Sequence, residues 1–119
     1  MKQLILMVAC LITLNQVQAQ KMSCNELYNF IIENGYKKAT LTNYQLNSEW
    51  LYKVTAYTYN YKTYVIAEIK ENEYSTKTKS YIFCNIPSLN WANFQNGTYV
   101  DSYGERFHKY IKEYTCNCD

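Results

Sequence analysis

The cysteines are the residues of this 119-residue chain whose type and spacing could do the most chemistry. There are five of them: Cys10, Cys24, Cys84, Cys116 and Cys118. The Cys-x-Cys pair near the end of the chain could hold Cu(I), which prefers soft thiolate ligands, but its spacing does not match the wider pairs of zinc sites. If the first cysteine is removed with a signal peptide, four remain. An even number in a small exported domain favours two disulfides over a metal site.

The pairing of these four cysteines is only partly determined by the sequence. A bridge between Cys116 and Cys118 would close a very small ring, which is hard to reconcile with unstrained disulfide geometry. The other two pairings both join the C-terminal tail to Cys24 and to Cys84, and the sequence leaves open which of them forms. Each bridge would close a long loop and contribute on the order of 2–4 kcal/mol to stability.

A catalytic site is hard to assemble from the remaining residues. The one histidine, His108, follows Phe107, which we expect to face the core, so we place the histidine at the surface. Glu68, Glu71 and Glu73 could be imagined as paired carboxylates, but they fall at a strand end and in a charged loop. The chain has no nucleophile elbow, phosphate-binding loop or zinc-protease helix motif. We therefore expect a protein that is not an enzyme and has no cofactor or metal.

The first nineteen residues have the features of a secretory signal peptide. Lys2 provides the positive n-region, residues 4–14 form an apolar stretch too short to span a bilayer, and Val17-Gln18-Ala19 supplies a cleavage site. A lipoprotein signal ending at Cys10 would leave almost no apolar region before that cysteine. We expect export to the periplasm or the extracellular space, a mature chain that begins at Gln20, and no transmembrane segment within it.

The composition limits the partners of the chain. Its formal net charge is only +2, so no strong field attracts nucleic acid or anionic lipid. The fourteen tyrosines are its unusual feature. Tyr57, Tyr59 and Tyr61 alternate along a predicted strand, where their rings would form an aromatic strip suited to stacking on sugars or partner side chains. Because tyrosine also has a high strand propensity, shielding of a sheet face is the competing interpretation.

The hydrophobic periodicity predicts a small α+β domain. Ser23 and Glu26 form a capping box that begins a helix, and Gly35 would end it. Alternating residues then predict an antiparallel β-meander of three to four strands, and two C-terminal helices carry apolar stripes that must pack on one face of it. The expected strands are 38–46, 50–59, 63–70 and 80–85. The first C-terminal helix is expected to begin at Pro87, and the second to span 103–114.

The strand at 50–59 has a clear two-residue period. One face is expected to carry Trp50, Tyr52, Val54 and Ala56, and the other face Leu51, Thr55, Tyr57 and Tyr59. The polar and charged stretch 71–79 is expected to be a solvated hairpin loop.

From Trp50 onward the chain resembles the KTSC domain family, a short domain found alone in bacteria and at the C-terminus of some lysyl-tRNA synthetases. Two positions depart from the family: Phe83 replaces its second tyrosine, and His108 stands where asparagine is common. The positions that carry the resemblance are Tyr81, Phe83, Pro87, Trp91, Ser102, Gly104, Phe107 and Ile111.

The signal peptide (1–19) leaves one domain (20–119), and the resemblance divides that domain in two. Within that domain, 20–48 is an N-terminal extension and 49–115 is the KTSC-like region. The family has no established activity, although RNA binding has been suggested from the synthetase fusion. The leading hypothesis is an exported, non-enzymatic interaction module that binds a protein or glycan partner. RNA binding is the alternative, and export and the near-neutral charge argue against it.

Overall fold

The structure is a computed structural model, and it describes residues 22–97 and 101–118. The expected signal peptide and its cleavage site lie outside these residues. Among the described residues, no helix is long and apolar enough to cross a membrane. The elements in chain order are α2 (Cys24–Asn34), β1 (Tyr36–Leu41), α3 (Asn43–Leu46), β2 (Leu51–Tyr59), β3 (Lys62–Lys70), β4 (Thr78–Phe83), α4 (Ser88–Asn96) and α5 (Tyr103–Tyr110).

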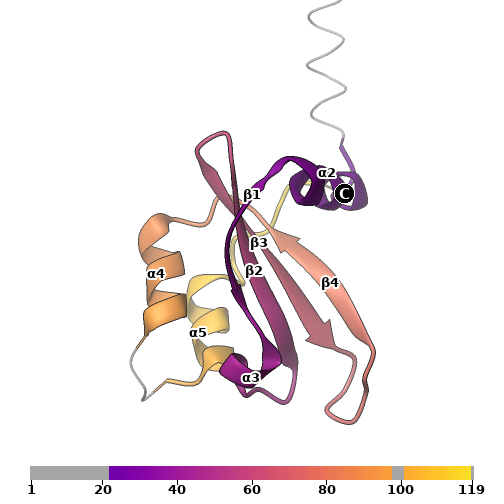
Figure 1. The fold of residues 1–119 in the computed structure, drawn as a ribbon, viewed down its shortest axis with the longest axis vertical. Coiled ribbons are helices and arrows are strands. Elements are labelled where there is room, and N and C mark those ends of the chain that lie inside the picture. Colours follow the sequence, from indigo (N-terminus) through magenta and orange to yellow (C-terminus); the bar gives the residue numbers. More distant parts are fainter. Residues whose placement is uncertain (1–21, 98–100, 119) are drawn as a thin grey trace, which may run out of the picture.

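The four strands form one antiparallel sheet in the order β1-β2-β3-β4, which confirms the predicted α+β meander (Figure 1). β2 and β3 are joined by a two-residue turn in which Asn60 and Tyr61 have φ of 50° and 64°. Positive φ at both central residues is the type I′ geometry, whose twist matches that of the flanking strands. Since the strands follow chain order, β1 and β4 are the two edges of the sheet.

The main core lies between the sheet and the two C-terminal helices, α4 and α5 (Figure 1). The Phe107 ring of α5 makes edge contacts with Trp50, Phe83 and Phe94, with ring centroids 5.7, 5.4 and 6.2 Å apart. Edge-to-face pairs of this kind add to the stabilisation that burial alone provides. The other fully buried side chains of this core include Leu51, Val54, Val65, Trp91 and Ile111.

The N-terminal helix α2 covers part of the opposite face of the sheet. Ile31 is fully buried there against Tyr57 of β2 and Ile66 of β3. Neighbouring residues of a strand point to opposite faces, so Val65 packs in the main core while Ile66 packs under α2. The expectation that helices cover only one face is therefore wrong.

Ser23, the predicted capping residue, begins α2, and Ser102, which was not predicted as a cap, begins α5 in the same way. The hydroxyl oxygens of Ser23 and Ser102 each accept the backbone N–H three residues later, at 3.1 Å, and so begin α2 and α5. Gly35 ends α2, but its backbone is extended and not left-handed. A Cβ at this position would lie 2.7 Å from the Ile31 carbonyl oxygen. Glycine is thus required here for close approach.

A β-bulge between Leu51 and Lys53 changes which side chains at the start of β2 point to each face of the sheet. A bulge adds one residue to one strand, so the alternation of faces is interrupted. Leu51 and Val54 are both fully buried in the main core, whereas Tyr52 is 40% exposed. The prediction that placed Tyr52 beside Val54, and Leu51 on the other face, is wrong.

Three predicted boundaries also differ from the structure. The strand expected at 38–46 is β1, which ends at Leu41, after which Thr42 begins the one-turn helix α3. The strand expected at 80–85 begins and ends two residues earlier, and Asn85 adopts a positive φ of 55°. The last helix ends at Tyr110 and not at 114, because the chain turns there and Thr115 pairs with the sheet.

Candidate functional site

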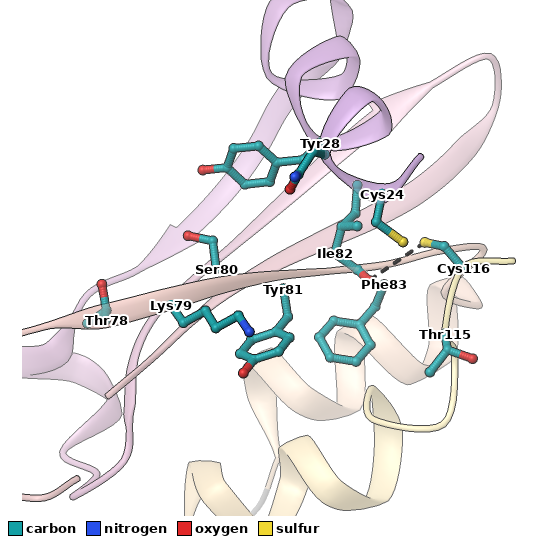
Figure 2. Close-up of a pocket in the computed structure, with 11 residues that line it drawn as sticks. Cys24, Tyr28, Thr78, Lys79, Ser80, Tyr81, Ile82, Phe83, Thr115 and Cys116 are labelled. Carbon is teal, nitrogen blue, oxygen red and sulfur yellow. Dashed lines mark hydrogen bonds between the residues drawn. The ribbon is translucent and has the colours of Figure 1, made fainter. Parts of the chain in front are cut away.

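A groove of about 740 Å³ runs along the free edge of β4 (Figure 2). β4 is the last strand in the sheet order, so none of the described strands continues the sheet beyond it. The first turns of α2 form one wall of the groove and the whole length of β4 forms another. The tail residues Thr115 and Cys116 close one end.

The C-terminal tail shows which backbone groups of β4 face outward. Cys84 donates its N–H to the carbonyl oxygen of Tyr114 at 2.8 Å, and Phe83 forms an antiparallel bridge with Thr115. Successive residues of an antiparallel strand direct their backbone groups to alternate sides, and the register of β4 with β3 is unbroken. Ser80, four residues before Cys84, therefore presents both its N–H and its C=O to the groove.

Side chains from both faces of β4 contribute to the groove. Ser80 projects toward the α2 side, where Tyr28 lies, and Lys79 and Tyr81 project to the other side (Figure 2). The Lys79 Nζ lies 5.4 Å from the centroid of the Tyr81 ring. Of the described residues that line the groove, Lys79 alone carries a charge. The groove thus combines aromatic surface, free backbone groups and one positive charge.

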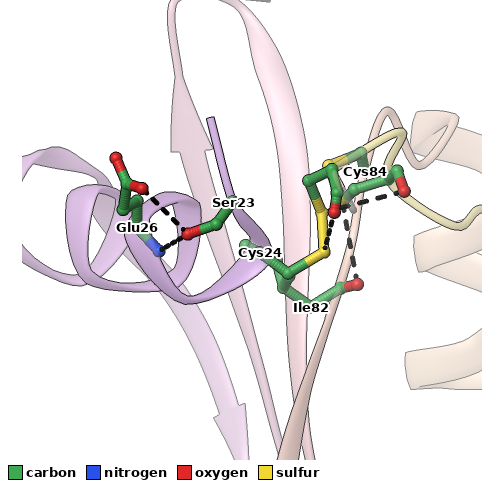
Figure 3. Close-up of a disulfide and its surroundings, with 7 residues drawn as sticks. Ser23, Cys24, Glu26, Ile82 and Cys84 are labelled. Atoms are coloured by element: carbon green, nitrogen blue, oxygen red, sulfur yellow. Dashed lines mark hydrogen bonds between the residues drawn. A yellow bond between two sulfur atoms is a disulfide. The ribbon is translucent and has the colours of Figure 1, made fainter. Parts of the chain in front are cut away.

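Two disulfides fix the tail beside the groove. They are Cys24–Cys118 and Cys84–Cys116, with Cα atoms 4.9 and 5.1 Å apart, which confirms two bridges and settles the pairing that the sequence left open. Cys84–Cys116 holds the tail on the end of β4, and Cys24–Cys118 joins the last residues of the tail to the start of α2 (Figure 3). Disulfides of this kind are typical of oxidising compartments.

The predicted strip of Tyr57, Tyr59 and Tyr61 is exposed only in part, because Tyr59 is 37% exposed and Tyr61 fully exposed, but Tyr57 is buried. Tyr57 is only 8% exposed, because α2 packs over it. Tyr59 makes an edge contact with the Phe30 ring of α2, with centroids 5.0 Å apart. Tyr61 is exposed, but it lies in the β2–β3 turn and not on the strand. Shielding of the sheet face, the competing interpretation, describes the role of Tyr57.

The histidine and the glutamates lie in ordinary surface settings. His108 is exposed on α5, as predicted, and its ring centroid is 5.2 Å from that of Trp50. Glu68 forms an ion pair with Lys53 at 3.9 Å, and the other two glutamates are exposed between β3 and β4. Within 22–97 and 101–118, no three His, Cys, Asp or Glu side chains gather in a way that could hold a metal ion.

Most residues that carry the family resemblance have structural roles. The four buried in the main core are Phe83, Trp91, Phe107 and Ile111. Ser102 caps α5, and Pro87 stands at the N-cap position of α4. Gly104 lies against the Trp50 indole, so close that an added Cβ would be 3.1 Å from Nε1. Tyr81, at 41% exposure, is the one aromatic of this set that a partner could touch.

Sequence reasoning missed Tyr28, Lys79 and Ser80 as residues of a possible site. One signal was available, because a meander places its last strand at an edge, and lysine on such a strand is typical of exposed edges. The position of α2 over the second face of the sheet had no comparable signal, and the groove depends on it.

Comparison with known proteins finds no match among family models, curated proteins or solved structures. These findings do not bear on the resemblance to the KTSC family, which stays a prediction. Function is therefore inferred from the geometry of this chain alone.

Proposed function

We propose that this protein is an exported, non-enzymatic interaction module that binds a partner protein in the groove along β4. The observation that supports the proposal is the outward-facing backbone of Ser80, which lies in a groove walled by Tyr28 and Tyr81. Sheet edges with free backbone groups are ready templates for another chain. A small exported domain that presents such an edge inside a groove is suited to capturing a protein segment.

The chemistry of the groove favours protein over the other partner classes. RNA binding depends mainly on phosphate contacts from several cations, and the groove-lining residues supply only Lys79. A glycan site would need aromatic faces on which sugar rings stack, but α2 covers Tyr57, the first ring of the expected strip, and its Phe30 ring packs against Tyr59, the second. Free backbone donors and acceptors on a strand match the backbone of another polypeptide best.

The two disulfides support the exported part of the proposal. Both depend on an oxidising environment to form and persist, and they tie together Cys24, Cys84 and the tail that borders the groove. The signal peptide expected from the sequence agrees with this compartment. We therefore propose that the partner is met in the periplasm or outside the cell.

Site-specific photo-crosslinking in the cells that make the protein tests the proposal. Tyr81, which is 41% exposed in the groove, is replaced by benzoylphenylalanine. The matched control carries the same replacement at Tyr44, which is 90% exposed on α3, a helix that packs on β1 and β2. We expect a discrete adduct of the Tyr81 variant that ribonuclease and glycosidase leave unchanged, and no adduct of the Tyr44 variant.

Three outcomes would contradict the proposal. One is equal crosslinking at Tyr81 and Tyr44, which would mean nonspecific contact. Another is an adduct at Tyr81 that ribonuclease or glycosidase removes, which would assign the groove to RNA or a glycan. The third is the absence of any adduct at Tyr81 while the folded, oxidised protein is present in the correct compartment.

A further inference from the structure

We infer that the partner docks as an extended peptide that adds antiparallel to β4, with an acidic residue opposite Lys79. This inference rests on the proposed function and names the kind of protein segment that the groove takes. It goes beyond a general protein-binding surface because the tail and the register of β4 fix which backbone atoms the peptide must meet.

The backbone of β4 defines the alignment of the peptide. The tail already pairs antiparallel with the end of this edge through Cys84 and Phe83. Continuing the same alignment toward the start of the strand puts one peptide residue directly opposite Ser80, with which it exchanges both backbone hydrogen bonds. The peptide residues before and after it direct their N–H groups away from β4. In strand addition these backbone bonds supply affinity, and the alternating side chains supply specificity.

The charge of the groove selects the next peptide residue. In an antiparallel pair, the residue that follows the one facing Ser80 lies opposite Lys79 and on the same face of the sheet. Lys79 is exposed and is the single charged side chain among the groove-lining residues. An opposite charge directly across the strands is favourable, and a like charge is unfavourable. The structure therefore assigns an Asp or Glu to this position.

The two remaining contacts are apolar. The peptide residue opposite Ser80 points to the α2 side, where Tyr28 forms the wall (Figure 2). The peptide residue before it lies opposite Tyr81 and shares its face, and aromatic and β-branched side chains pair well across strands. The recognised segment thus reads, from N- to C-terminus, aromatic, aliphatic, acidic.

A second copy of this chain fits the edge less well. The tail occupies the end of β4, so the free stretch spans Thr78–Tyr81, roughly 13 Å of strand. A stable dimer usually buries about 800 Å² on each partner, which so short an edge does not provide by itself. A peptide needs only this stretch and the groove beside it.

The first experiment titrates the oxidised protein with the peptide acetyl-Ser-Tyr-Val-Asp-Thr-Ser-amide, followed by amide chemical shifts. We expect saturable binding with the largest shifts at Lys79, Ser80 and Tyr81. N-methylation of the peptide valine removes the N–H that donates to Ser80, and should weaken binding at least about tenfold. N-methylation of the peptide tyrosine is the matched control, because its N–H points away from β4, and should change affinity by less than about threefold.

The second experiment exchanges the charges. Lys79→Glu should weaken binding of this peptide, and replacing the peptide aspartate by lysine should restore it in that variant. Lys77→Glu is the control, since Lys77 is exposed nearby but does not line the groove. Its effect should stay within about twofold at physiological salt, where exposed charges are screened beyond about 8 Å.

Several results would overturn strand addition. Equal loss from the two N-methylated peptides would do so, as would failure of the charge exchange to restore binding, or no saturable binding of the peptide. A dimer that dissociates on dilution and that the peptide cannot disrupt would assign the edge to a second copy. Each of these results leaves the photo-crosslink at Tyr81 intact if a partner protein binds the groove in another way, so the two proposals fail separately.

Discussion

Replacing Gly104 with alanine tests whether this glycine is present to admit the Trp50 indole. Gly104 lies in the first turn of α5 without a positive φ, so its backbone alone does not require glycine. An added Cβ would lie 3.1 Å from Nε1 and 3.2 Å from Cζ2 of Trp50, which forces the ring to move by a few tenths of an ångström. Overpacking of this kind costs about 1–3 kcal/mol, and alanine offsets up to about 1 kcal/mol through its helix propensity. We expect a net loss of about 1 kcal/mol in the free energy of unfolding.

A double-mutant cycle isolates the contact between these two residues. Trp50→Leu removes all three ring atoms that the new Cβ would approach. In that background Gly104→Ala should raise the free energy of unfolding by up to about 1 kcal/mol, so the coupling energy should be about 1–3 kcal/mol. Urea unfolding of the four oxidised proteins, followed by far-ultraviolet circular dichroism, measures it without relying on tryptophan fluorescence.

A matched control distinguishes the ring contact from a general effect of alanine. A Cβ at Gly97 would lie 2.6 Å from the backbone carbonyl oxygen of Asn93, so Gly97→Ala should destabilise the protein to the same extent with or without Trp50. Additivity of Gly104→Ala and Trp50→Leu within about 0.5 kcal/mol would refute the explanation. The glycine would then have to be attributed to some feature other than the indole.

Three further predictions follow from single features of the structure. Burial first, and neighbouring ionisable groups second, raise the pKa of Tyr57 and Tyr64 above their usual 10.0. The stability that the two neutral phenols contribute to the fold is therefore full below pH 10 and is lost as pH rises through the folded-state pKa values. Replacing both tyrosines with phenylalanine should lessen the loss of ellipticity at alkaline pH. An unchanged profile of ellipticity against pH would contradict this. Joint replacement of Cys24 and Cys118 by serine opens a bridge between residues 94 apart, and it should lower the free energy of unfolding in urea by about 4–5 kcal/mol. A loss under about 1 kcal/mol would be inconsistent with stabilisation by loop-closure entropy. Ser102→Ala removes the N-cap acceptor of α5 and should cost about 1 kcal/mol in thermal unfolding, so an unchanged Tm would argue against the cap.

The parts of the fold with strong local signals were predictable from the sequence. Ser23 with Glu26 is a short-range capping signal, and the structure uses Ser23 to begin α2. The turn at Asn60 and Tyr61 and the strands beside it also depend on neighbouring residues only. Such features are fixed by a few adjacent side chains, so the sequence displays them directly.

The features that the sequence did not reveal depend on distant contacts. The bulge after Leu51 interrupts the alternation of β2 within its pairing with β3, and it leaves Leu51 buried in the main core. The end of α5 at Tyr110 reflects the return of Thr115 to the sheet, which the helical periodicity of the segment does not report. A two-residue or 3.6-residue period records what one element prefers and not where its neighbours interrupt it.

The candidate site shows the same division. The cysteines could be counted, and the disulfides followed, but only the folded chain shows that Cys24 meets Cys118 and Cys84 meets Cys116. The alternation of tyrosines at Tyr57 correctly predicted a strand. The exposure of the Tyr57 side chain, however, depends on α2, a separate segment that reaches it only in the folded chain. Groove residues come from three segments, so no local pattern could have assembled them.

The path of the tail explains why the edge of β4 is both protected and open. Thr115 faces Phe83, so a tail that continued along β4 in the same alignment would place Asn117 opposite Tyr81 and fill the groove. The bond between Cys118 and Cys24 instead draws the tail toward α2. The covalent link that ties the helix to the end of the chain therefore also keeps the backbone of the strand accessible. An edge shielded at one end by its own tail, and left free for about four residues beyond it, accepts a short segment while offering little to long-range sheet extension.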